Sequence, residues 1–567
     1  MSGSRGRGWI DELLPGVGVA RRYERAWLRP DLTAGAALFA LVIPAGMAYA
    51  EVAGLPPVTG LYATIVPLLV YGLVGPSRVL VLGPDSSLAP MIAAAVLPLA
   101  LGSAERAVAL AGLLAVLMGV VLIAGRALRL GFVTGLLSRP IRVGYLNGIA
   151  LVVIVSQLPK VLGTAVPGGS VWATLGQTAR GVLAGTANGS AVLVGVASWA
   201  VIVLARRVGS PVPGVLIAVA GSMVATAVLG LGEHLAVVGA LPRGLPAPAL
   251  SGLRPGDVMA LLVPAAGIAL IAFADTGVLS RTLAGRHGYA VSGNQEMGAL
   301  GVANAATGLL GGFPVSGSTS RTPVAVQAGA RTQLAGVVAA VLVLLFMVVL
   351  PGVTAYLPSS TLAAVVIVAA SSFVDVRGLI RLARMSPGET GLLVAAFLGV
   401  AFIGVLQGIL VAIGLSFVTF VRQAWDPYRA ELVRLDGTPG YHDLSRHPAG
   451  RRTPGLVIAR FDAPLFFANG AVFVSFVKDL VDAAPQPVRW VVVAAEPITG
   501  IDTTALDDLI ELDEHLERRG TSLVFAEMKG PVKDRLLRFG AGARFGPEHF
   551  FPTVGSAVKA FRRETGG

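Results

Sequence analysis

The chain has 567 residues, of which 54% are hydrophobic and only 13% are charged, and its mean hydropathy is +0.76. Soluble domains carry about 25% charged residues, so this composition excludes a soluble globular protein. The chain also contains many apolar runs close to the roughly 20 residues that a helix needs to cross a bilayer. We therefore expect a polytopic α-helical membrane protein.

Charge is distributed unevenly along the chain. Residues 1–426 hold 26 Lys and Arg against 14 Asp and Glu, whereas residues 427–567 hold 18 of each. The whole excess of +12 therefore lies in the apolar part, where basic residues indicate membrane topology rather than nucleic-acid binding. The absence of cysteine excludes disulfides and thiolate metal sites, and the six histidines show no metal-ligand spacing, so we expect no metal and no cofactor.

Fourteen apolar spans can be drawn before residue 425. Seven precede the polar segment 232–256 and seven follow it, so we expect the two halves to be related by inversion, as in many secondary transporters. With the N-terminus inside, the arginines that flank the spans fall on the cytoplasmic side, as the positive-inside rule requires. The expected spans are 33–50, 58–74, 86–102, 107–125, 143–158, 191–205, 211–231, 257–280, 294–310, 319–330, 333–356, 359–372, 388–405 and 407–424.

We expect three parts along the chain. Residues 1–30 form a cytoplasmic N-terminal segment, residues 31–425 a transmembrane domain, and residues 426–567 a linker and a cytosolic domain, so that both termini face the cytoplasm. In the tail, strands alternate with amphipathic helices, which is typical of a small α/β domain. The expected strands are Leu456–Arg460, Val491–Ala494 and Leu523–Ala526, and the expected helices are Ala471–Val481, Thr504–Arg519 and Val532–Phe539.

Two spans, the third in each half, are interrupted at corresponding places. Val79–Leu82 is followed by Gly83-Pro84-Asp85-Ser86-Ser87, and Gly311–Val315 is followed by Ser316-Gly317-Ser318-Thr319-Ser320-Arg321-Thr322. Each pattern predicts an extended segment, a break, a capping cluster and then a short helix. Gly/Pro-interrupted segments at matching positions of two halves indicate a transport site at the membrane midplane.

These motifs resemble those of the sulfate permease (SulP) family of anion transporters over nearly the whole chain. The first span contains Pro44-Ala45-Gly46-Met47-Ala48, the tenth contains Ser320-Arg321-Thr322, and Gly500-Ile501-Asp502-Thr503-Thr504 in the tail resembles a STAS domain (sulfate transporter and anti-sigma-factor antagonist). The resemblance implies a uracil-permease-like 7+7 inverted repeat with core and gate subdomains, an elevator-type motion and a homodimer. It also implies a small anion as substrate: sulfate, bicarbonate, chloride or a dicarboxylate.

The polar residues at the two breaks are the candidate substrate ligands. Arg321 supplies a full positive charge and a donor fork that fits sulfate, carboxylate or bicarbonate oxygens. An arginine within a membrane segment is functional by default, and the alternatives are that it snorkels to the interface or pairs structurally with an acid. For the hydroxyls and Asp85, helix capping is the competing interpretation. These further candidates are Ser86, Ser318, Thr319, Ser320 and Asp85.

Two acids are candidates for coupling transport to protons or to another cation, with protons favoured over sodium because Arg321 is positively charged. Asp275 lies inside the eighth span, where a buried carboxyl group can take up a proton and compensate the charge of an incoming anion. Its alternative is a structural bond to Arg321 or to a backbone amide. An ionised Asp85 would compete with the anion for Arg321. Our hypothesis is that Asp85 and Arg321 pair in the empty site and that protonation of Asp85 admits the substrate.

Thr503 is a candidate regulatory phosphorylation site. It resembles the phosphorylatable position of STAS domains, which follows an aspartate such as Asp502 at a helix start. A phosphate there would add nearly two negative charges. The alternative is that Thr503 only caps the helix.

We interpret the chain as a secondary active transporter of a small anion, sulfate first, in the cytoplasmic membrane, with proton symport. A bicarbonate or dicarboxylate carrier of the same family is the nearest alternative, and a membrane-anchored STAS signalling module is the alternative from another class. An enzyme is not expected, because the tail shows neither a catalytic triad nor a Gly-rich nucleotide loop. The expected partners are the anion, membrane lipid and a second copy of the chain, and not nucleic acid.

Overall fold

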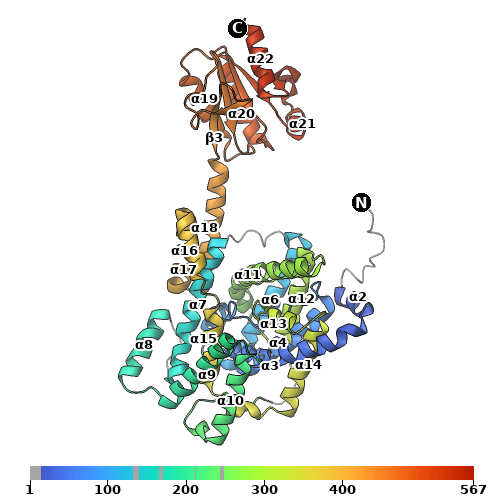
Figure 1. Ribbon diagram of the computed structural model, residues 1–567, viewed down its shortest axis with the longest axis vertical. Helices are drawn as coiled ribbons and strands as arrows, with labels where there is room; N and C mark the ends of the chain where they lie inside the picture. The colour runs from blue at the N-terminus through green and yellow to red at the C-terminus, as the bar shows by residue number, and fades with distance from the viewer. Residues whose placement is uncertain are drawn as a thin grey trace. The chain divides into compact units, whose positions relative to one another are not determined.

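The computed structural model describes residues 14–131, 139–164, 170–210, 212–242, 248 and 250–566. The chain divides into two compact units, residues 1–416 and 417–567. The first contains the apolar helices and the second contains a small α/β domain (Figure 1). Residues 1–13 of the expected N-terminal segment and residues 243–247 and 249 of the polar segment lie outside the described residues.

Each of the fourteen expected spans contains a helix. The sequence analysis did not predict two further helices, α8 (Val171–Leu183) and α16 (Val376–Met385), nor the short α2 (Pro15–Arg21) before the first span. The helices in the expected spans are α3 (Leu28–Val52), α4 (Pro57–Val74), α5 (Ala89–Ala100), α6 (Ala104–Ala127), α7 (Arg139–Leu162), α9 (Gly189–Val208), α10 (Gly214–Val228), α11 (Pro255–His287), α12 (Gly293–Leu309), α13 (Arg321–Gln327), α14 (Leu334–Val349), α15 (Ser359–Ser371), α17 (Pro387–Leu398) and α18 (Val405–Trp425).

The helices have the lengths and composition of membrane spans. Among the described residues, seven helical segments are long and apolar enough to cross a bilayer, and five shorter apolar helices accompany them. Both α5 and α13 are short because an extended segment precedes each of them. The expected polytopic helical membrane fold is confirmed.

The two interrupted spans meet through their extended segments. Strand β1 (Leu82–Gly83) pairs antiparallel with β2 (Ser316–Gly317), with Leu82 opposite Gly317 and Gly83 opposite Ser316. All four residues are buried. Backbone groups this deep in an apolar environment need hydrogen-bond partners, and the antiparallel pairing supplies some of them.

Glycines allow α6 and α12 to pack with their backbones in close approach. A Cβ atom on Gly308 would lie 2.2 Å from the carbonyl oxygen of Gly112, and one on Gly301 would lie 2.9 Å from that of Gly119. Small residues at a helix interface permit this approach, which favours association of helices in membranes.

We therefore expect Gly308→Ala to lower the apparent melting temperature of the purified protein. The added methyl group must push backbone away, and overpacking of this kind costs about 1–3 kcal/mol. Gly285→Ala in α11 is the matched control, because a Cβ atom there would have no neighbour within 4 Å. The control should melt at or above the wild-type temperature. Equal melting temperatures for the two variants would contradict the packing argument.

The second unit is built on a six-stranded sheet with the order β4-β3-β5-β6-β7-β8. Strands β5 to β8 are parallel, and β3 pairs antiparallel with both β4 and β5. The strands are β3 (Arg429–Arg434), β4 (Tyr441–Asp443), β5 (Leu456–Phe461), β6 (Trp490–Ala494), β7 (Ser522–Ala526) and β8 (Phe550–Phe551), and the helices are α19 (Gly470–Asp482), α20 (Thr503–Glu517), α21 (Gly530–Arg538) and α22 (Val554–Thr565).

Alternating residues of the central strands form two separate cores. Val457, Val491 and Phe525 pack with α19, α20 and α21 on one face, whereas Ile458 and Val492 pack with α22 on the other. The three strands and three helices expected from the sequence are confirmed. The strands β3, β4 and β8 and the helix α22 were missed.

Candidate functional site

The two breaks cross at one place, held by main-chain and side-chain hydrogen bonds. Next to the β1–β2 pairing, the Ser318 amide donates to the Val81 carbonyl at 2.9 Å, and the Val81 amide donates to Thr322 Oγ1 at 3.1 Å. The segment before α5 is therefore fixed directly to the start of α13. The structure thus brings together the two polar clusters that are far apart in the sequence.

Two neighbouring helices, α11 and α12, hold the second break in place through side-chain hydrogen bonds. Asn304 in α12 accepts from the Val315 amide at 2.8 Å and donates to the Val315 carbonyl at 3.1 Å. Thr276 Oγ1 in α11 accepts from the Gly317 amide at 2.8 Å. Each bond satisfies a buried backbone group that the short strand leaves unpaired, so the break is held in one conformation.

Arg321 is the most deeply buried cation at this crossing, with 1% of its surface exposed. Its Nε donates to Ser318 Oγ at 2.9 Å and its Nη2 donates to the Pro84 carbonyl. Its Nη1 has no hydrogen-bond partner among the residues that the structure describes. A Cβ atom at Gly83 would lie 2.9 Å from Nη1, so glycine leaves the room that the guanidinium occupies. The result is a buried, positively charged N–H donor without an acceptor.

Asp85 does not form the ion pair with Arg321 that we expected for the empty site. Its Oδ1 instead accepts from the Ser87 amide at 2.9 Å and from Ser87 Oγ at 2.7 Å, so the carboxylate caps its own turn. It still lies close enough to Arg321 to act on it electrostatically. Ser86, the next residue, is buried with 5% exposure. The local turn outcompetes the long-range pair because it needs no further ordering of the chain.

Asp275 in α11 belongs to the same electrostatic neighbourhood. It is half-buried, and its charged or polar neighbours are Asp85, Arg142 and Tyr145. The Tyr145 side chain in α7 is 0% exposed, and its hydroxyl lies beside the Asp275 carboxyl group. Tyr49 in α3 lies near Asp85 and Arg321. The sequence analysis missed both tyrosines, although a hydroxyl within an apolar span is a signal that could have found them.

The remaining hydroxyls of the second break differ in exposure. Ser318 is fully buried, whereas Thr319 and Ser320 are exposed. Ser318 Oγ lies 3.2 Å from Ser320 Oγ and accepts from the Arg321 amide at 3.2 Å. Ser318 is therefore the hydroxyl that positions Arg321.

In the second unit, Thr503 is exposed and is the first residue of α20. The cap is Asp502, whose Oδ1 accepts from the Ala505 amide at 2.8 Å and whose Oδ2 accepts from the Phe467 amide at 2.8 Å. The alternative interpretation, that Thr503 caps the helix, is therefore wrong, because the carboxylate before it already fills that role.

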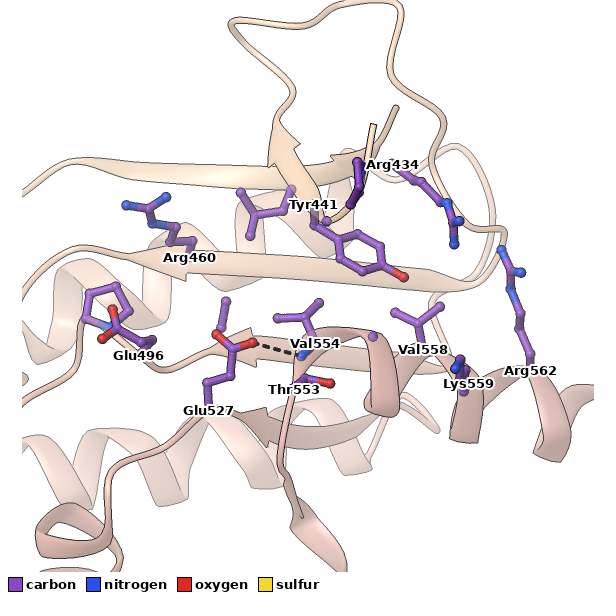
Figure 2. Close-up of a pocket in the computed structure, with 16 residues that line it drawn as sticks. Arg434, Tyr441, Arg460, Glu496, Glu527, Thr553, Val554, Val558, Lys559 and Arg562 are labelled. Carbon is purple, nitrogen blue, oxygen red and sulfur yellow. Dashed lines mark hydrogen bonds between the residues drawn. The ribbon is translucent and has the colours of Figure 1, made fainter. Parts of the chain in front are cut away.

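The second unit also contains a pocket of about 660 Å³ between β3, β4 and the start of α22 (Figure 2). Arg434, Lys559 and Arg562 lie on its lining, and none of them forms an ion pair with a described residue. Glu527 accepts a hydrogen bond from the Val554 amide at 3.3 Å. This carboxylate already occupies the N-terminal end of α22.

The helical membrane fold and the β1–β2 crossing are typical of one class of protein. This class is a membrane transporter whose two interrupted spans meet around a buried cation, here Arg321. Residues 28–396 match the Sulfate permease family and residues 447–557 match the STAS domain. The probable sulfate transporter Rv1739c of Mycobacterium tuberculosis is 40% identical, over 98% of this chain and 98% of that protein. The chain belongs to the sulfate permease family of anion transporters and carries a STAS domain; it is a transporter and not an enzyme.

Two solved structures share the fold at low sequence identity. The inward-facing structure of murine Slc26a9 superposes with a TM-score of 0.91 at 22% identity, covering 98% of this chain and 95% of that one. The transmembrane domain of the cyanobacterial bicarbonate transporter BicA gives a TM-score of 0.61 at 22% identity, covering 70% of this chain and 98% of that one. The similarity to Slc26a9 covers both units of the chain, whereas BicA is compared through its transmembrane domain alone.

We expect Thr276→Val to disturb the site and Thr282→Val, in the same helix, to leave it intact. The first substitution leaves the buried Gly317 amide without an acceptor, at a cost of about 1–3 kcal/mol. Thr282 is exposed and bonds only the Val278 carbonyl of its own helix, at 2.8 Å. Thermal melting of the purified variants should show a lower midpoint for Thr276→Val alone. A wild-type midpoint for both would mean that this bond does not hold the break.

Proposed function

We propose that this protein is a secondary active transporter that carries sulfate across the cytoplasmic membrane and binds it at the crossing of the two interrupted spans. The observation that carries the proposal is the Nη1 of Arg321, a buried charged donor with no acceptor. Leaving such a group unpaired destabilises the protein. A bound anion would remove this penalty because it supplies the missing acceptor. The Tyr145 hydroxyl lies beside Asp275 and near Asp85, which also neighbours Arg321, and adds a polar group to the site.

The chemistry of the donors favours an oxyanion. A guanidinium presents its N–H groups in a planar fork that matches two oxygens of a sulfate or carboxylate. Relatives are named as sulfate transporters, which makes sulfate the first candidate. BicA is named as a bicarbonate transporter, so bicarbonate is the alternative substrate. A dicarboxylate, which the resemblance to the family also implies, is a further alternative.

We assign proton coupling to Asp275 and Asp85. Asp85 neighbours Arg321 and Asp275 neighbours Asp85, so two negative charges and a divalent anion bound at Arg321 would repel one another. Protonation of one or both would remove that repulsion when sulfate enters, so a proton would accompany the anion. Asp85 would act here without first breaking an ion pair, since it caps its own turn.

The proposal extends to the motion and assembly of the protein. We propose an elevator-type motion of a core subdomain against a gate, a homodimer, and both termini in the cytoplasm. The 1–30 segment, the 31–425 transport domain and the 426–567 linker and STAS domain are the corresponding parts. Thr503 remains a proposed phosphorylation site: it is exposed at the start of α20, where a phosphate would interact favourably with the helix dipole.

The substrate site is tested by sulfate binding and uptake in proteoliposomes. We expect Arg321→Gln to weaken sulfate binding by roughly 10- to 100-fold, since a hydrogen bond to a charged group contributes about 1.5–3 kcal/mol. Arg321→Lys should retain part of the affinity because it keeps the charge but loses the fork. Arg286→Gln, at an exposed position of α11, is the matched control and should bind as wild type. Wild-type sulfate affinity in Arg321→Gln would show that Arg321 does not bind the substrate. If bicarbonate but not sulfate raised the melting temperature of the wild-type protein, bicarbonate would be the substrate.

Proton coupling is tested by comparing sulfate uptake with and without an inward proton gradient. We expect the gradient to accelerate uptake by the wild type and to have little effect on Asp275→Asn or Asp85→Asn. Asp375→Asn serves as the control, because Asp375 is an exposed N-cap that asparagine replaces well. If both site variants kept the full gradient dependence, neither carboxyl would be the coupling group. No uptake of any anion by the wild type would favour the signalling module instead.

A further inference from the structure

The short helix α2 covers an apolar pocket at one end of the transmembrane helices. α2 packs against α4, and a Cβ atom on Gly16 would lie 2.0 Å from the carbonyl oxygen of Gly72 (Figure 1). Beside this contact is a pocket of about 650 Å³. Its apolar lining comes from α2, from the end of α4 and from the start of α14, and includes Val17, Leu69, Leu73, Leu334 and Val337.

A second pocket of about 390 Å³ adjoins the first and shares Val19 and Arg78 with it. Its lining is more polar and includes Trp27, Tyr289 and Gln295. None of the described residues that line either pocket is acidic. The two pockets thus join an apolar compartment to a cationic one.

The cationic side chains lie where a lipid headgroup would be. The pockets contact the ends of spans, since one candidate span begins at Arg25 and another ends at Val74. Arg78 is exposed, has no ion pair among the described residues, and lies over the Tyr289 ring at 5.5 Å. The adjoining segment carries four exposed arginines and one exposed acid, Glu24, and tryptophan and arginine are typical of membrane interfaces. These arginines are Arg21, Arg22, Arg25 and Arg29.

We propose that the joined pockets bind one anionic phospholipid, with an acyl chain in the apolar pocket beneath α2 and the headgroup phosphate at Arg78. The apolar compartment is too large and too apolar to be filled by a free phosphate. The positive charge of Arg78, which has no ion pair among the described residues, favours an anionic headgroup over a zwitterionic one.

Hydrogen bonds connect this lipid site to both interrupted spans. Tyr23, which lines the apolar pocket, donates to Asp31 at 3.0 Å, and Asp31 accepts from the Arg331 amide at 2.7 Å, just after α13. Burial and the neighbouring carboxylate raise the pKa of Tyr23 to about 12, so its hydroxyl remains a donor at neutral pH. Gln333, also on the lining, donates to the Leu80 carbonyl at 2.8 Å, just before β1. Lipid occupancy therefore stabilises the segments that carry the anion site.

The test uses the delipidated full-length protein without sulfate, so its outcome is independent of the transport proposal. Phosphatidylglycerol, phosphatidylcholine with the same acyl chains, and inorganic phosphate are each titrated while melting temperature and bound lipid are followed, the latter by native mass spectrometry. We expect only phosphatidylglycerol to raise the melting temperature and to remain bound. Arg78→Gln should weaken this binding roughly fivefold, whereas Arg78→Lys and the control Arg286→Gln should not.

Three outcomes would overturn the proposal. Equal stabilisation by both phospholipids would show an unselective contact with the bilayer. An equal effect of inorganic phosphate would show a small-anion site without a lipid. Undiminished phosphatidylglycerol binding in a folded Arg78→Gln variant would place the lipid elsewhere. If Arg78→Gln failed to fold, Val19→Asp would be used instead, because Val19 borders both pockets. A smaller preference of this variant for phosphatidylglycerol over phosphatidylcholine would then support the proposal, and an unchanged preference would contradict it.

Discussion

The burial of one positive charge at Arg321 constrains the transmembrane domain. A guanidinium with 1% exposure needs acceptors for its N–H groups, and here Nη2 donates to a carbonyl of the first break and Nε to a hydroxyl of the second. Both breaks must therefore come together before the charge can be accommodated. The β1–β2 pairing brings them together, and the absence of a side chain at Gly83 leaves the space for the guanidinium.

Buried polar groups in this domain fall into two kinds, which differ in whether their hydrogen bonds are complete. Asp31 is 0% exposed and accepts four hydrogen bonds, and Glu296 is 1% exposed and accepts two short hydroxyl bonds of 2.5 and 2.7 Å. These acids tie helices together and leave nothing for a ligand. Arg321 Nη1, by contrast, is a donor without an acceptor among the described residues. The contrast separates structural groups from those available to an anion.

The sequence was sufficient for the order of the spans, the positions of the two breaks and the presence of Arg321 at the second break. Apolar length, Gly/Pro interruption and charge are local properties, so they can be read without knowing the fold. Partners distant in the sequence could not be predicted in this way. Asp85 was expected to pair with Arg321 but bonds Ser87 instead, and Tyr145 was overlooked because its position opposite Asp275 depends on how α7 packs. Helix α22 was missed although its buried residues Val554, Val558 and Phe561 recur at helical spacing.

The most direct test of the account is sulfate protection of a single cysteine at the crossing. The chain contains no cysteine, so Ser320→Cys, at an exposed position beside Arg321, gives a unique thiol whose rate of labelling can be measured in membranes with and without sulfate. Thr282→Cys, exposed elsewhere on α11, is the reference. The account predicts saturable protection at position 320 only, lost when Arg321→Gln is added. Equal labelling rates with and without sulfate, in a Ser320→Cys variant that still transports sulfate, would contradict it.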